Sequence, residues 1–149
     1  MKDYLHKVQY HETDKMGITH HSNYVKWMEE ARIDFLDQIG FGYAKLEADG
    51  IVSPVIGLEC KYKHSTTFDD TVRIRVWVEE FKGVKLVIGY TMELEPAAGD
   101  AQEPGEFVCE ARSEHCFLSK DGRPVILKKQ FPELDRALRE LAENYRAMR

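Results

Sequence analysis

Acidic and imidazole side chains gather in one short stretch near the start of the chain. The segment YHETDKMGITHHSNY places Asp14 in a loop that contains Gly17, and it places His20 and His21 directly before the expected start of a helix. The unpaired amides and the dipole of a helix N-terminus attract developing negative charge. A carboxylate held there could act as a nucleophile or as a general base. The spacing is also compatible with a plain turn, in which Asp14 shapes the loop and the histidines are solvated.

Other catalytic chemistries lack their sequence patterns. The N-terminal histidines form no HExxH or HxH motif and have no cysteine partner, so we expect no metal site. The chain also has no GxSxG nucleophile motif and no glycine-rich phosphate loop. Three widely spaced cysteines without a CxxC pair favour reduced packing residues, and these are Cys60, Cys109 and Cys116.

Composition sets wider limits on the function. The chain has 149 residues, of which 43% are hydrophobic and 32% are charged, as expected for one globular domain over residues 1–149. The net charge of −5 argues against a dedicated nucleic-acid-binding protein, which would show a basic face. No apolar stretch approaches the roughly 18 residues of a membrane helix. The N-terminus also lacks the apolar core of a signal peptide, so we expect a cytoplasmic protein with no membrane span.

Apolar periodicity predicts the elements that position this stretch. Residues 6–11 alternate like a short strand, and residues 22–40 form a helix that is apolar on many sides. Beyond Pro54 the period changes to two, which predicts long strands at 56–62, 72–78, 84–94 and 107–118.

The remaining segments are expected to be connections and one more helix. Residues 42–50 look irregular or weakly helical, and the polar segment that begins at Pro96 suits a hairpin tip. The pair Asp121-Gly122 predicts a tight turn, with a short strand at 124–127 behind it. Residues 132–149 carry leucines at helical spacing, which predicts an amphipathic terminal helix.

This order of elements predicts an α+β fold. Short hairpin connections require antiparallel pairing, and a sheet with one apolar face must cover that face. The early helix is the obvious cover. Three apolar residues also occupy outward strand positions, which indicates that a second surface is buried, for example by another subunit; they are Trp77, Val87 and Val108.

The same N-terminal stretch resembles the active-site signature of hotdog-fold acyl-CoA thioesterases of the 4-hydroxybenzoyl-CoA thioesterase-like type. The family pattern of an aromatic residue, an acidic-Thr-Asp run, a Gly, a His and a Tyr is matched by Tyr10, Glu12-Thr13-Asp14, Gly17, His21 and Tyr24. A WMExAR-like helix follows in both. The segment FDDTVRIRVWVEEFKGVKLVIGY and the DGRP turn also resemble the family, so the likeness covers most of residues 8–125.

The resemblance implies a hotdog fold, in which a five-stranded antiparallel sheet wraps a long central helix, here with a C-terminal helix added. It implies hydrolysis of an acyl-CoA thioester to a free acid and CoA, with Asp14 as nucleophile or general base. The helix N-terminus would stabilise the oxyanion, and His21 would act through its amide or its ring. No cofactor is implied, and the active sites of such proteins lie at the interface of a homodimer or homotetramer.

The resemblance also nominates residues that contact the substrate. Tyr24 would line the acyl pocket or pack in the core, and Glu29 would contact the substrate or pair with Arg32 on one helix face. Lys82 and Lys85, around the FKGVK turn, would hold the CoA phosphates or act as solubilising charges.

Two other functions remain open at this stage. A hotdog acyl-CoA hydratase or dehydratase would use the same fold, but it would need a paired acid and base, and only Asp14 is clearly placed. A non-catalytic acyl-CoA-binding module would bind the thioester without releasing a thiol.

Overall fold

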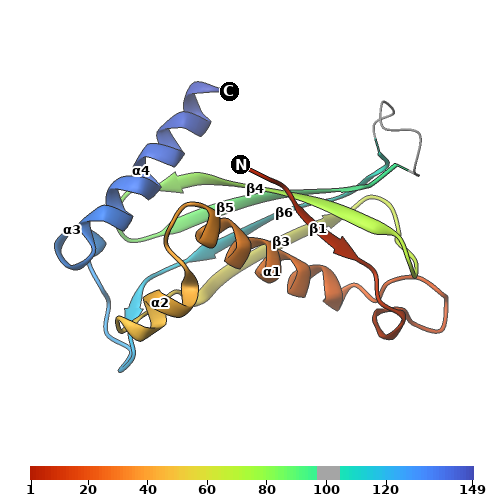
Figure 1. Ribbon diagram of the computed structural model, residues 1–149, viewed down its shortest axis with the longest axis horizontal. Coiled ribbons are helices and arrows are strands. Elements are labelled where there is room, and N and C mark those ends of the chain that lie inside the picture. Colours follow the sequence, from red (N-terminus) through yellow and green to blue (C-terminus); the bar gives the residue numbers. More distant parts are fainter. Residues whose placement is uncertain (97–104) are drawn as a thin grey trace. The chain divides into compact units, whose positions relative to one another are not determined.

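The computed structural model describes residues 1–96 and 105–149 (Figure 1). The predicted hairpin tip that begins at Pro96 therefore falls mostly outside the described residues. The described residues form four helices, α1 (Ser22–Gln38), α2 (Tyr43–Ala48), α3 (Leu127–Gln130) and α4 (Pro132–Ala147), and a 3-10 turn, η1, covers Tyr10–Glu12. The strands are β1 (Tyr4–Lys7), β2 (Ile51–Val52), β3 (Val55–Tyr62), β4 (Thr71–Phe81), β5 (Leu86–Leu94), β6 (Phe107–His115) and β7 (Leu118–Ser119).

Five of these strands form one antiparallel sheet, in the order β1-β4-β5-β6-β3 (Figure 1). The first strand pairs with β4, with Tyr4 opposite Ile74 and Lys7 opposite Thr71. Strands β2 and β7 form a separate two-stranded sheet. The α+β class, the five-stranded antiparallel sheet and the two main helices are therefore confirmed. No helix among the described residues has the length and apolar character needed to cross a membrane.

The described residues group into two compact units, each with its own buried side chains. The first unit comprises Met1–Asp34, Cys60–Val76 and the described part of Tyr90–Ala111. Its core includes the α1 residues Trp27 and Met28, which are at most 1% exposed. The Met28 sulfur lies 3.5 Å from the Cys60 sulfur of β3, so α1 packs on the sheet in this unit.

The second unit comprises Phe35–Glu59, Trp77–Gly89 and Arg112–Arg149. Helix α4 buries Leu134 and Leu138 here, and its Tyr145 ring stacks on the Trp77 indole at a centroid distance of 5.9 Å. A Cβ at Gly89 would overlap that indole, so the glycine leaves the space that Trp77 fills. The C-terminal helix of the chain itself therefore covers Trp77, where the sequence suggested another subunit as the cover.

Three predicted strand boundaries were wrong. The first strand ends at Lys7, Val8 is fully buried, and the chain then turns through η1, in which Tyr10 is 76% exposed. The strand expected at 107–118 ends at His115, and Leu118 begins β7, which pairs with β2. The strand expected at 124–127 is reduced to an isolated bridge between Leu118 and Pro124, because α3 begins at Leu127.

Two connections behave as expected. The tight turn at Asp121-Gly122 is confirmed, since Gly122 has a φ of 84° and its N–H donates to the Ser119 carbonyl at 2.9 Å. The weakly helical segment at 42–50 contains the short helix α2.

Candidate active site

The candidate site is built on a small hairpin that precedes α1. Thr13 and Thr19 form an isolated antiparallel bridge, and between them the Asp14 N–H donates to the Ile18 carbonyl at 2.9 Å. Gly17 closes the turn with a φ of 78°, and a Cβ there would meet no atom within 4 Å. The glycine is therefore needed for the backbone angle rather than for space.

Contacts with the segment between β3 and β4 fix this hairpin. The Thr19 N–H donates to the Thr66 carbonyl at 2.9 Å, and the two threonine hydroxyls lie 2.6 Å apart. Both threonines are buried. The Thr67 hydroxyl donates to the Gly17 carbonyl at 2.7 Å. The loop that carries Asp14 is therefore held at its base and at its turn.

The carboxylate of Asp14 is half-buried and only partly engaged. Its Oδ1 accepts the Met16 N–H at 2.8 Å, which is a local turn bond. Within residues 1–96 and 105–149, Oδ2 has no hydrogen-bond partner. The hydrogen bond at Oδ1 therefore orients the carboxylate, and Oδ2 is open to a substrate or a water molecule.

The start of α1 leaves one amide open beside this loop. The Ser22 N–H donates to His20 Nδ1 at 3.3 Å, and the Asn23 N–H donates to the His20 carbonyl at 3.0 Å. The Tyr24 N–H donates to the His21 carbonyl at 3.3 Å. The His21 N–H has no hydrogen-bond partner in the described part of the chain. This amide is thus the free donor between the hairpin and the helix.

Aromatic rings lie on one side of His21. Its imidazole lies 6.3 Å from the Tyr62 ring, which in turn lies 5.2 Å from the Tyr24 ring. Tyr24 is buried and its hydroxyl lies 3.1 Å from the Thr66 hydroxyl, whereas Tyr62 is 47% exposed. Burial is the first cause that raises the pKa of Tyr62 to about 12, followed by its neighbour Cys60, so this phenol stays neutral at physiological pH.

The structure brings four of the predicted site residues into the first unit. Asp14, His21 and Tyr24 lie on the hairpin and the first turn of α1, and Glu29 is exposed further along the same helix. No ion pair joins Glu29 to Arg32 among the described residues, so the expected pairing on the helix face does not form. No hydrogen bond joins Asp14 to His21 in the same described part. The roles of these four residues remain predictions.

Lys82 and Lys85 lie in the second unit, at the connection between β4 and β5. The Lys82 ammonium lies 3.6 Å from a Glu80 carboxylate oxygen, and the Lys85 ammonium lies 3.6 Å from a Glu114 carboxylate oxygen. Both lysines are exposed, so these pairs contribute little to stability. The phosphate-binding role of the lysines remains a prediction.

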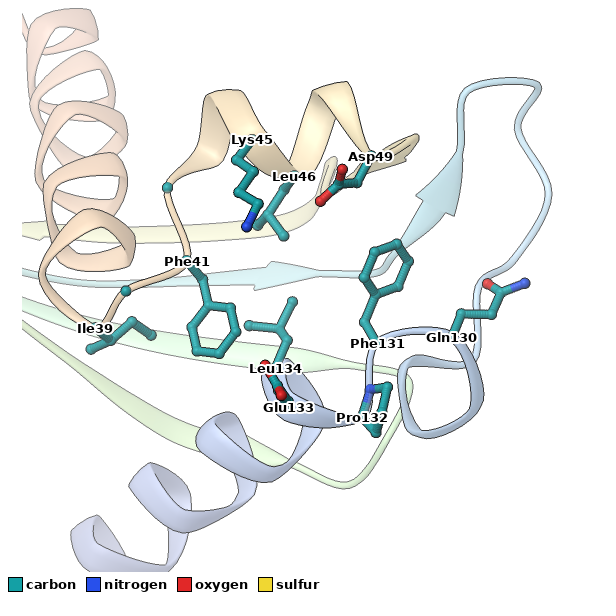
Figure 2. Close-up of a pocket in the computed structure, with 12 residues that line it drawn as sticks. Ile39, Phe41, Lys45, Leu46, Asp49, Gln130, Phe131, Pro132, Glu133 and Leu134 are labelled. Carbon is teal, nitrogen blue, oxygen red and sulfur yellow. The ribbon is translucent and has the colours of Figure 1, made fainter.

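A separate cavity of about 490 Å³ lies in the second unit, and none of the predicted site residues lines it. Figure 2 shows the side chains of Phe41, Leu46, Phe131 and Leu134 turned towards one another, with polar residues such as Lys45 around them. Elsewhere, no group of three or more His, Cys, Asp or Glu side chains is placed to hold a metal ion, as far as the described residues go.

A buried polar cluster beneath the hairpin was not predicted from the sequence. Glu12 lies in the interior, where it is 5% exposed. Its carboxylate bonds the His6 and Trp27 side chains. An acidic residue directly beside the loop motif was the available signal, but residue spacing did not identify its partners.

Comparisons with known proteins agree on the type of protein. A family model described as the thioesterase-like superfamily matches residues 8–141. YneP of Bacillus subtilis (strain 168), a candidate acyl-CoA thioesterase, is 35% identical over 128 residues, which are 85% of this chain and 87% of that protein.

Solved structures give the same result. The DHNA-CoA thioesterase from Staphylococcus aureus matches with a TM-score of 0.90 and 30% identity, over 99% of this chain and 95% of that chain. The BH1999 gentisyl-coenzyme A thioesterase matches with a TM-score of 0.74 and 25% identity, over 83% of this chain and 94% of that chain.

Proposed function

We propose the following mechanism for this chain, which belongs to the thioesterase-like superfamily and is a hotdog-fold acyl-CoA thioester hydrolase. Asp14 supplies the reacting carboxylate, and the His21 amide stabilises the oxyanion. The supporting observation is that the two ends of one fixed hairpin carry an open carboxylate oxygen and an open N–H. A thioester carbonyl needs these two groups, one to attack it or activate water and one to take up its charge.

Two routes use the same groups. In the nucleophilic route, Asp14 Oδ2 attacks the thioester carbon, the C–S bond breaks, and CoA leaves as the thiolate. Water then hydrolyses the mixed anhydride, which releases the acid and restores the carboxylate. In the general-base route, Asp14 takes a proton from a water molecule that attacks the same carbon. The C–S bond then breaks to release the acid, and the proton passes from Asp14 to the departing CoA thiolate. In both routes the His21 N–H donates to the carbonyl oxygen as it becomes negative.

The two alternative functions, a hydratase or dehydratase and a binding module, would give different outcomes from hydrolysis. A hydratase or dehydratase would convert an enoyl thioester without releasing free thiol. A binding module would bind acyl-CoA without any turnover. The relatives' names favour hydrolysis, and the structure offers a single open carboxylate on the hairpin rather than an acid and base pair.

We expect Asp14→Asn to abolish most of the activity, because the amide keeps the size of the side chain and loses its basicity. Loss of a general base typically costs about 10²–10⁴-fold, and loss of a nucleophile costs as much or more. The loss should appear in kcat, measured by thiol release from an acyl-CoA. His21→Ala keeps the backbone amide and should retain activity to within about tenfold. An Asp14→Asn variant with more than about a tenth of the wild-type kcat would contradict the mechanism.

The acyl group that we propose is aromatic. Tyr62 presents a half-exposed ring next to His21, and an aromatic acyl group can stack there. Two matching structures are thioesterases of DHNA-CoA and gentisyl-CoA, and the gentisyl group is an aromatic ring.

A panel of thioesters tests this preference. Benzoyl-CoA and hydroxybenzoyl-CoA should give a higher kcat/KM than hexanoyl-CoA or palmitoyl-CoA in the thiol-release assay. The variant Tyr62→Leu should lower kcat/KM for the aromatic substrates and leave the alkyl substrates nearly unchanged, because only stacking is removed. An equal loss for both classes would show that Tyr62 does not select the acyl group.

Lys82 and Lys85 are proposed to hold the CoA phosphates as point charges. The double variant Lys82→Ala/Lys85→Ala should raise KM for CoA thioesters several-fold and leave kcat unchanged. Small thioesters without the nucleotide tail should be unaffected. The matched control is Lys128→Ala/Lys129→Ala on α3, which removes the same charge from another exposed site. The assignment is wrong if the control raises KM equally or if small thioesters respond in the same way.

A homo-oligomer is proposed to complete the active enzyme. Strand β3 is the last strand of the sheet order, so one of its edges is open in the described residues. Its apolar side chains are about half exposed, including Val55 at 48%, Ile56 at 55% and Leu58 at 47%. An open edge with exposed apolar residues is a template for pairing with a second chain.

Light scattering and activity test this assembly. The wild-type chain should be a dimer or tetramer, and Ile56→Lys should shift it towards monomer and lower the activity in parallel. Ile126→Lys, which replaces an equally exposed isoleucine in the segment before α3, is the control. A wild-type monomer that is fully active at nanomolar concentration would rule out the proposal.

A further inference from the structure

Glu12 is a buried carboxylate beside the site that the mechanism does not use. It is 5% exposed and lies two residues before Asp14. Acidic side chains are almost never buried unless they are paired. Its Oε1 accepts the Gln9 N–H at 2.8 Å and lies 2.9 Å from His6 Nε2, while its Oε2 accepts the Trp27 indole N–H at 2.7 Å.

The backbone of the same residue reaches the other side of the hairpin. The Glu12 carbonyl accepts the His20 N–H at 2.9 Å and the side-chain amide N–H of Asn23 at 2.9 Å. His20 directly precedes His21, and Asn23 lies in the first turn of α1. Glu12 is therefore bonded both to the strand that leads into the loop and to the helix start that follows it.

A second carboxylate holds the other nitrogen of His6. His6 Nδ1 lies 2.9 Å from Glu30 Oε2, which also accepts the Tyr4 hydroxyl at 3.0 Å. The two ring nitrogens of His6 therefore each face a carboxylate, Nε2 that of Glu12 and Nδ1 that of Glu30. Its ring lies 4.5 Å from the Trp27 ring. The His6 ring is thus packed against α1 through Trp27 and also contacts α1 through the Glu30 carboxylate.

We propose that Glu12 is a positioning residue, which fixes the distance between the Asp14 carboxylate and the His21 amide. This inference rests on the proposed function, since it takes those two groups as the reacting ones. The side chain of Glu12 is bonded to His6 of β1, to Gln9 directly before η1 and to Trp27 of α1, so loss of these bonds would loosen the base of the hairpin against the helix. Catalytic groups that shift by 1 Å can lose about 10²-fold in rate.

The protonation state of Glu12 agrees with this role. Burial raises the pKa of its carboxyl, but the Gln9 amide, His6 and Trp27 stabilise the charged form and hold the pKa below its usual value. The ionised Glu12 carboxylate therefore stabilises the folded state fully above the ordinary glutamate pKa. This stabilisation is lost as the pH falls through the lowered pKa of Glu12. The charged groups around His6 are Glu12 and Glu30, and Tyr4, which donates to Glu30, also lies near Asp34.

The test compares Glu12→Gln with Glu30→Gln. Each variant removes one negative charge and one carboxylate partner of His6, but only the Glu12 side chain also accepts the Gln9 N–H and the Trp27 indole N–H, which an amide in its place cannot both retain. We expect Glu12→Gln to lower kcat by about tenfold or more, because the reacting groups lose their register. KM should change much less, because the CoA tail binds elsewhere. Glu30→Gln should keep kcat within about twofold, since the hairpin bonds remain.

Circular dichroism and thermal melting show whether each variant is folded. If Glu12→Gln does not fold, Trp27→Phe replaces it, because this variant removes only the indole donor of Oε2 and keeps an aromatic ring; it should lower kcat with little change in KM. Folded variants with wild-type kcat would overturn the positioning role, and so would equal losses in Glu12→Gln and Glu30→Gln. Activity retained by Asp14→Asn would instead refute the proposed mechanism, whatever the Glu12 variants do.

Discussion

A buried carboxylate needs hydrogen-bond donors, and the arrangement of the elements around the candidate site depends on the groups that supply them to Glu12. An unpaired charge in the interior would cost several kcal/mol, at least ~3. Glu12 avoids this cost with one backbone amide, one imidazole and one indole. These groups belong to the segment after β1, to β1 itself and to α1. Glu12, the residue directly before the hairpin, therefore contacts all three of these segments in the interior.

The main architecture could be predicted from apolar periodicity, because burial on one face imposes it. The alternation at Val72, Ile74 and Val78 marks buried positions of β4, and the α1 spacing marks Trp27 and Met28. Periodicity does not report which segment covers an apolar residue. Trp77 therefore suggested a second subunit, although Tyr145 of the same chain stacks on it. The lost strand at 124–127 has a similar cause, since a short apolar run fits a strand or a helix start equally well.

The candidate site was only partly accessible from the sequence. The position of Asp14 in a loop before a helix was compatible with a reactive carboxylate or a plain turn, and the resemblance to the thioesterase signature singled it out, while Gly17 marked the turn. The foundation below it, formed by His6, Glu12 and Glu30, could not be predicted, because hydrogen bonds between distant residues leave no spacing pattern. The contact of the exposed His20 ring with the Ser22 amide and hydroxyl was also not predicted. The neighbouring His21 amide is the open donor in the described part of the chain.

The two tryptophans of the chain lie in different compact units, which makes each unit optically distinguishable. Trp27 is fully buried in the first unit, with its indole N–H on a carboxylate, whereas Trp77 in the second unit is stacked on Tyr145. Indole emission depends on the polarity and contacts of the ring. Loss of structure in each unit should therefore change the emission of the tryptophan in that unit. With one tryptophan replaced by phenylalanine at a time, fluorescence would follow the foundation of the hairpin and the docking of α4 as separate events within a single chain.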